Sequence, residues 1–271
     1  MSKFFTIRKT GILVFLFIFA YFPTLQWMWE RWFERDSYYS HGILIPFLTI
    51  LLIWQKRDVL KRIKVEPSPW GLRLFIAGII IHAASLLFRV YFTSGFSMII
   101  VLAGIILTVW GKNILKEVAF PVIFLIFMVP LPLVTVINAS FQLKLLSAKM
   151  AAATLDVINI PAIQQGSYIR MSNASVVVDD VCSGLRSLIA LMALGAILAY
   201  WMRSGKIKKT VLFISSIPVA LIANMFRIMA LATICEFWGA KYITGFVHDL
   251  LGFLVFILAF FFLSLIERLL R

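Results

Sequence analysis

A cysteine, an arginine and a histidine that could together perform acyl transfer occur at the ends of apolar segments. Cys182 stands in the run Asp180-Val181-Cys182-Ser183-Gly184-Leu185-Arg186, just before an apolar stretch. Ser183 and Gly184 are typical of a turn into a helix, and the positive end of a helix dipole favours a thiolate. Arg186, one helical turn further, would add to this effect. Cys182 is therefore a candidate nucleophile, and the alternative is a small buried hydrophobic residue.

Two further polar residues, Arg227 and His248, are unfavourable in hydrocarbon and lie at the ends of later apolar segments. Arg227 is predicted at the outer end of its segment, on the same helical face as Asn224. It could stabilise an oxyanion as a fixed cation, or simply extend to the interface. His248 could take a proton from a thiol and return it to a leaving amine. A lone interfacial histidine is, however, often incidental.

The other two histidines, His41 and His82, are weaker candidates for a chemical role. His41, in Tyr38-Tyr39-Ser40-His41-Gly42, begins the second apolar segment, where tyrosines commonly anchor the interface. His82 falls in the middle of the third segment, where a neutral, packed imidazole is expected. Three histidines in three distant segments show no metal-ligand spacing, so no metal site is predicted.

The second cysteine, Cys235, offers a different explanation for Cys182. The two could form a structural disulfide in an oxidising compartment. Cys235 lies in the apolar stretch 230–237, and a disulfide would leave the nearby arginines and His248 without a role. We therefore favour the nucleophile.

The composition excludes a soluble domain. The chain has 271 residues, of which 62% are hydrophobic and 14% charged, and a soluble domain of this size cannot bury that much apolar surface. The apolar segments have the length that a bilayer requires. The sequence predicts a single all-α polytopic membrane domain, residues 1–271, with about eight spans: 10–29, 41–55, 71–88, 94–110, 118–134, 184–201, 210–228 and 249–266.

The basic residues predict the orientation of these spans. Seventeen of the 26 Lys and Arg residues fall on the side that both termini share. The positive-inside rule therefore places both termini in the cytoplasm, and Cys182, Arg227 and His248 at the outer face. The net charge of +14 reflects this topology rather than a nucleic-acid partner.

The longest outer stretch, residues 135–181, leads directly to Cys182. Residues 138–158 have the apolar spacing of an amphipathic helix in the outer interface. Residues 164–178 alternate as strands around Ser172-Asn173-Ala174, which predicts a short β-hairpin.

An ordered set of motifs resembles the exosortase/archaeosortase family over nearly the whole chain. The motifs are the run around Cys182, then Ala223-Asn224-Met225-Phe226-Arg227, then Gly245-Phe246-Val247-His248-Asp249. Tyr39-Ser40-His41-Gly42 is similar to the family's N-terminal signature. A histidine at the third position is typical of bacterial members, and Asp180 stands where many relatives have Glu.

The resemblance implies a cysteine transpeptidase or protease of the bacterial cytoplasmic (inner) membrane that uses no cofactor. Its partners would be secreted proteins that carry a C-terminal motif, a transmembrane helix and a basic tail. By position, Cys182 would be the nucleophile, with Arg227 and His248 as its catalytic partners. The residues expected to bind substrate or support the site are Arg186, Asn224, Asp180, Ser183 and His41.

Two other classes of function remain open at the level of the sequence. A transporter would also carry intramembrane Arg and His, but predicts polar residues along several mid-bilayer helices, which are sparse here. A non-catalytic subunit of exopolysaccharide assembly or export predicts that Cys182→Ala is harmless.

Overall fold

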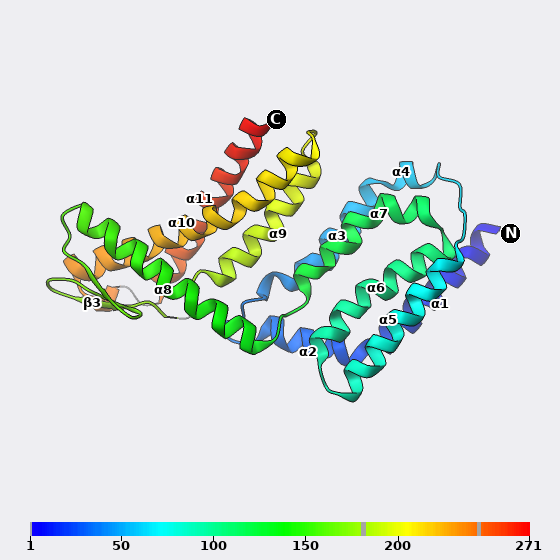
Figure 1. Cartoon of the computed structure of the whole chain (residues 1–271), viewed down its shortest axis with the longest axis horizontal. Coiled ribbons are helices and arrows are strands. Elements are labelled where there is room, and N and C mark those ends of the chain that lie inside the picture. Colours follow the sequence, from blue (N-terminus) through cyan, green and yellow to red (C-terminus); the bar gives the residue numbers. More distant parts are fainter. Residues whose placement is uncertain (1, 180–182, 243–244) are drawn as a thin grey trace. The chain divides into compact units, whose positions relative to one another are not determined.

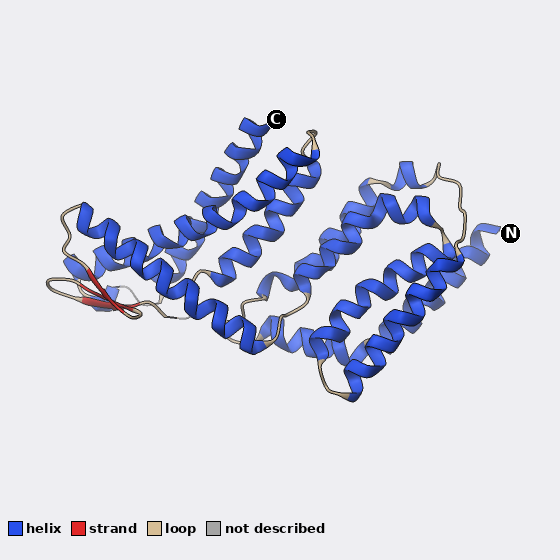
Figure 2. Cartoon of the chain, viewed as in Figure 1, coloured by secondary structure: helices blue, strands red, loops and turns tan. Residues whose placement is uncertain are grey.

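The computed structural model describes residues 2–179, 183–242 and 245–271, and the chain within them is mostly helical (Figure 2). It divides into two compact units, Met1–Leu131 and Pro132–Arg271 (Figure 1). The first unit contains α1 (Ser2–Ala20), α2 (Phe22–Phe33), η1 (Ser40–Ile43), α3 (Leu44–Gln55), α4 (Arg57–Leu60), α5 (Pro69–Leu87), α6 (Tyr91–Val109), α7 (Lys112–Phe124) and η2 (Leu125–Met128). The second contains α8 (Leu133–Val157), β1 (Ile163–Gln165), β2 (Tyr168–Arg170), β3 (Ser175–Val177), α9 (Leu185–Trp201), α10 (Lys206–Trp238), η4 (Ala240–Tyr242) and α11 (Phe246–Leu270).

The helices confirm an all-α polytopic membrane protein. Among the described residues, four helices are long and apolar enough to cross a membrane, namely α5, α6, α10 and α11. The count rises to six if each of two bent helix pairs is one span. Two shorter apolar helices, Ser40–Gln55 and Leu185–Trp201, overlap the remaining predicted segments. If both of these shorter helices also cross the membrane, the number of spans reaches the predicted eight.

The first predicted span, residues 10–29, is not one straight helix. It breaks between α1 and α2, which are bent by 68°. Proline lies within the first two positions of α2, where it cannot donate to the preceding turn. The carbonyl of Ala20, at the break, instead accepts a hydrogen bond from Nε2 of His82 (3.1 Å). His82 is buried, as predicted, and joins α5 to this bend.

A second break separates α7–η2 from α8. The fifth predicted span, 118–134, therefore ends early, because helical structure stops at Met128 before Pro130 and Pro132. A helix covers nearly all of the stretch 138–158, as predicted, and it begins earlier, at Leu133.

The predicted hairpin is a three-stranded antiparallel sheet of order β1-β2-β3. The β2–β3 hairpin was expected. The extra strand arises because Gly166 adopts φ +64° and turns the chain between β1 and β2. Ile169 and Val176, paired across β2 and β3, are buried on the face that packs against α8 and α10. The sheet thus carries the chain along this core toward the start of α9.

Three helices, α9, α10 and α11, lie side by side in the second unit (Figure 1). Their core includes Leu191 of α9, Leu212 and Ala220 of α10, and Leu263 of α11, all at most 2% exposed. α10 is the central element, because α8 and β3 also pack on it. It therefore carries the residues on which the candidate site converges.

Candidate functional site

The start of α9 is one side of the candidate site. Cys182 and Asp180 lie outside the described residues. Ser183, next in the chain, is 1% exposed, and its hydroxyl accepts a hydrogen bond from the backbone N–H of Leu185 (3.4 Å). Gly184 caps the helix with φ +82°, a left-handed conformation that favours glycine. Arg186 lies in the first helical turn and is partly buried.

Asn224 of α10 packs directly against this helix start. A Cβ atom on Gly184 would lie 2.8 Å from the side-chain amide of Asn224, so the two residues leave no space between them. Asn224 is 2% exposed, and its Nδ2 donates to Oγ of Ser147 in α8 (3.2 Å). Asn224 therefore connects α8, α10 and the backbone two residues after Cys182.

Arg227 does not lie at the end of its helix as predicted. α10 continues for eleven residues beyond it, to Trp238. Its side chain is 8% exposed, and Nη2 donates to the backbone carbonyl of His248 (3.4 Å). A Cβ atom on Gly252 would lie 3.2 Å from the same nitrogen. The guanidinium is thus packed against the first two turns of α11.

His248 lies inside α11, in its first turn, rather than before the span. It is partly buried, and its backbone carbonyl is the group that meets Arg227. The structure therefore brings Arg227 and the His248 segment together, and separately brings Asn224 to the start of α9. Asn224 and Arg227 are both buried but contact different helices.

Sequence reasoning missed Ser147 and Gly252, the partners of Asn224 and Arg227. Ser147 left no signal, because a serine in an amphipathic helix is ordinary. Gly252 did leave one, since glycine inside a helix is unfavourable by roughly 0.5–1 kcal/mol relative to alanine and suggests close packing. Here the close neighbour is the arginine.

His41 belongs to the other unit, Met1–Leu131. It lies in η1 with its ring 6.1 Å from that of Tyr39, and both of its ring nitrogens are shielded from solvent. Burial raises the pKa of the Tyr39 hydroxyl above its usual range. Gly42 lies against the indole of Trp32, whose Nε1 donates to the carbonyl of Met128 (2.9 Å). This segment is therefore fixed by close packing.

The second cysteine is buried in α10. Cys235 is 1% exposed, carries a free thiol and belongs to the core that also contains Ile169 and Leu155. The free thiol argues against the disulfide alternative. In the part of the chain that the structure describes, no group of three or more His, Cys, Asp or Glu residues could hold a metal ion.

Comparison with known proteins gives the family. Searches of curated proteins and of solved structures found no match to this chain. Residues 29–265 match the family model described as Transmembrane exosortase (Exosortase_EpsH). This range includes the predicted motifs, from the His41 segment to His248 in α11. The chain therefore belongs to the transmembrane exosortase family.

Proposed function

We propose that the chain is a membrane-embedded cysteine transpeptidase or protease. It would cleave the C-terminal sorting signal of secreted proteins at the outer face of the bacterial cytoplasmic membrane, through a thioester. Its substrates would carry a short motif, a transmembrane helix and a basic tail. The tail would face the cytoplasm, in agreement with the orientation that the basic residues predict.

The observation that carries the proposal is the contact of Arg227 with the first turn of α11. A buried cation is unfavourable unless it is paired or hydrogen-bonded. Here the guanidinium is held beside the backbone of His248, the candidate acid and base. Asn224 is held beside the backbone that follows Cys182. Both contacts start from α10, which would give the three catalytic residues a common support.

The proposed reaction has two steps. The Cys182 thiol gives its proton to His248, and the thiolate attacks the scissile carbonyl carbon. Arg227 stabilises the oxyanion that forms. The carbon–nitrogen bond then breaks, and the departing amine takes the proton from His248. An amine acceptor or water attacks the thioester, the carbon–sulfur bond breaks, and the thiol is restored.

The test is processing of a co-expressed protein that carries a candidate C-terminal signal. Wild type is compared with Cys182→Ala and Cys182→Ser at matched abundance in the membrane, and Cys235→Ala serves as the matched cysteine control. We expect loss of cleavage in both Cys182 variants and cleavage in the control. The mass of the new C-terminus distinguishes a free acid, formed by hydrolysis, from an amide, formed by transpeptidation.

Unchanged processing by Cys182→Ala contradicts the proposal. It would favour a non-catalytic membrane subunit of exopolysaccharide assembly, which needs no nucleophile. Loss of processing in Cys235→Ala as well, at normal abundance, would instead indicate that both thiols are structural.

A further inference from the structure

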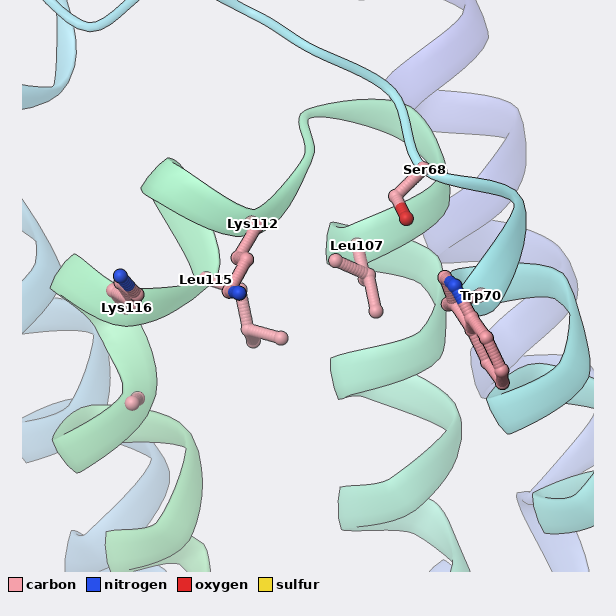
Figure 3. A pocket seen from close by; sticks show the side chains of 7 residues that line it. Ser68, Trp70, Leu107, Lys112, Leu115 and Lys116 are labelled. Carbon is pink, nitrogen blue, oxygen red and sulfur yellow. The ribbon is translucent and has the colours of Figure 1, made fainter.

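A cavity of about 460 Å³ opens in the first unit where α5 begins, α6 ends and α7 begins (Figure 3). Its walls are mainly apolar, and the polar residues among those that line it are Lys112, Lys116 and Ser68, whose hydroxyl points into the cavity (Figure 3). The lining residues are Trp70, Leu107, Leu115 and Ala119, together with Lys112, Lys116 and Ser68. Apolar walls beside two cations fit an amphipathic anion.

The two lysines lack a compensating charge within the described part of the chain. Lys112 and Lys116 are four residues apart on α7, so their ammonium groups share a helical face and repel one another. Neither forms an ion pair with another described residue. Glu117, which follows Lys116, is paired with Lys56 (2.8 Å). The positive charge at the cavity is therefore available to a ligand.

The edge of the cavity is preformed. The backbone N–H of Glu66 donates to the carbonyl of Trp110 (3.3 Å), which ties the loop before α5 to the turn between α6 and α7. Gly111 in that turn has φ +90°, and a Cβ atom there would collide with the carbonyl of Glu66. The carboxylate of Glu66 forms an ion pair with Nζ of Lys64 (3.3 Å). A ligand would therefore meet a fixed edge without a free carboxylate.

The position of the cavity matches the depth of lipid headgroups. Trp70 is 65% exposed, and the guanidinium of Arg73 lies over its ring at 4.2 Å. Exposed tryptophans paired with cations are typical of the membrane interface. The charge distribution places this end of the helices on the cytoplasmic side, where anionic lipids attract basic residues.

We propose that this cavity binds an anionic phospholipid of the cytoplasmic leaflet. The lipid phosphate would lie between Lys112 and Lys116, within reach of the Ser68 hydroxyl. One acyl chain would run along Leu107 and Leu115. This site does not depend on the proposed peptidase function, since every residue that forms it belongs to α5, α6, α7 and their connections.

The experiment measures lipid binding to the full chain in detergent by native mass spectrometry. The probes are phosphatidylglycerol, phosphatidylcholine and soluble glycerol phosphate, which has the phosphate but no acyl chain. The double variant Lys112→Gln/Lys116→Gln removes both cavity charges. Lys206→Gln/Lys208→Gln removes two exposed charges at the start of α10, outside the cavity, and is the matched control. Ala119→Trp fills the apolar part and keeps both lysines.

We expect wild type to bind phosphatidylglycerol more tightly than phosphatidylcholine. The cavity double variant should lose about 30-fold in affinity for phosphatidylglycerol, since each lysine near the surface contributes roughly fivefold. The control should stay within about twofold of wild type. Ala119→Trp should also weaken binding of phosphatidylglycerol. If the double variant does not fold, each single glutamine variant should show about a fivefold loss.

Three results would overturn the proposal. The first is equal binding of phosphatidylglycerol by wild type and both lysine variants. The second is an equal loss in the control, which would indicate diffuse surface charge. The third is binding of glycerol phosphate as tight as that of the lipid and unaffected by Ala119→Trp, which would indicate a site for free phosphate.

Discussion

Asn224 of α10 lies directly against Gly184 at the start of α9. A Cβ atom on Gly184 would come within 2.8 Å of the amide carbon and nitrogen of Asn224, and the φ of +82° independently favours glycine. Two separate constraints therefore act on the residue that is two positions from Cys182. Asn224 also donates a hydrogen bond to Ser147 of α8, so displacing Asn224 would disturb α8 as well.

Gly184→Ala should lower both processing and stability. The left-handed conformation is unfavourable for alanine by about 1–2 kcal/mol, and the new methyl group would displace Asn224. We expect at least a tenfold loss of substrate processing, because a small displacement of catalytic groups can reduce the rate by about 100-fold. Processing at matched abundance and the thermal midpoint in detergent are the two measurements.

Gly166→Ala is the matched control for Gly184→Ala. Gly166 also has a positive φ (+64°), but nothing lies within 4 Å of a Cβ atom there. It should lose stability through backbone strain alone and keep its processing activity. Identical effects of the two variants on processing would show that the contact with Asn224 is unimportant.

The apolar segments determine which helices form, and this part of the fold was predictable. α5, α6, α9, α10 and α11 all overlap their predicted spans, because the length of an apolar run reflects the thickness of the bilayer. The β2–β3 hairpin followed in the same way from the alternation of side chains around residues 172–174.

The ends and bends of the helices were harder to predict. Arg227 suggested the end of a span, but helical hydrogen bonding continues past it, because α11 buries the guanidinium that would otherwise need water. The contacts of Asn224 with Ser147 and of Arg227 with Gly252 depend on which helices pack together. The glycine at position 252 indicates close packing, but no local pattern shows which residue packs against it. The roles of all the predicted site residues stay predictions, and Cys182 and Asp180 also lie outside the described residues.

Arg227→Lys should reduce processing although it keeps the positive charge. A lysine cannot reproduce the planar, forked donors that reach the carbonyl of His248. We expect a loss of about 100-fold or more in the rate constant, as for removal of an oxyanion donor. Single-turnover processing with excess enzyme separates this effect from weaker substrate binding.

Two variants complete the test of Arg227. Arg203→Lys changes an exposed arginine in the same way and should process normally. Gly252→Ala keeps Arg227 but places a methyl group 3.2 Å from Nη2, so an intermediate loss is expected. Full activity of Arg227→Lys would remove the arginine from the proposed mechanism.

Cys235 should resist modification in the folded protein. Its thiol is buried in the core formed by α8, α10 and the sheet. In a Cys182→Ala background, a membrane-permeant maleimide should label the chain slowly until detergent denatures it. Labelling is read from the shift in mass. Rapid labelling of this variant in native membranes would contradict the burial of Cys235 and, with it, the use of Cys235→Ala as a neutral control.

Ser94→Ala should destabilise the first unit through a chain of buried hydrogen bonds. The carbonyl of Ala20 can only accept, so Nε2 of His82 donates to it, and Nδ1 must then accept from the hydroxyl of Ser94 (2.8 Å). The oxygen of Ser94 in turn accepts from the hydroxyl of Thr24 (2.6 Å). Removing Ser94 leaves both neighbours without this partner inside the helix bundle.

The expected loss for Ser94→Ala is about 1–3 kcal/mol, the usual effect of leaving buried polar groups unsatisfied. It is measured from the thermal or denaturant midpoint in detergent. Ser264→Ala is the matched control, because Ser264 is not among the buried residues and its hydroxyl bonds only within its own helix, to the carbonyl of Phe260 (2.9 Å). That variant should stay within about 0.5 kcal/mol of wild type. Equal midpoints for the two variants would mean that the bend between α1 and α2 is held by proline and packing, and that the hydrogen bonds of His82 contribute little.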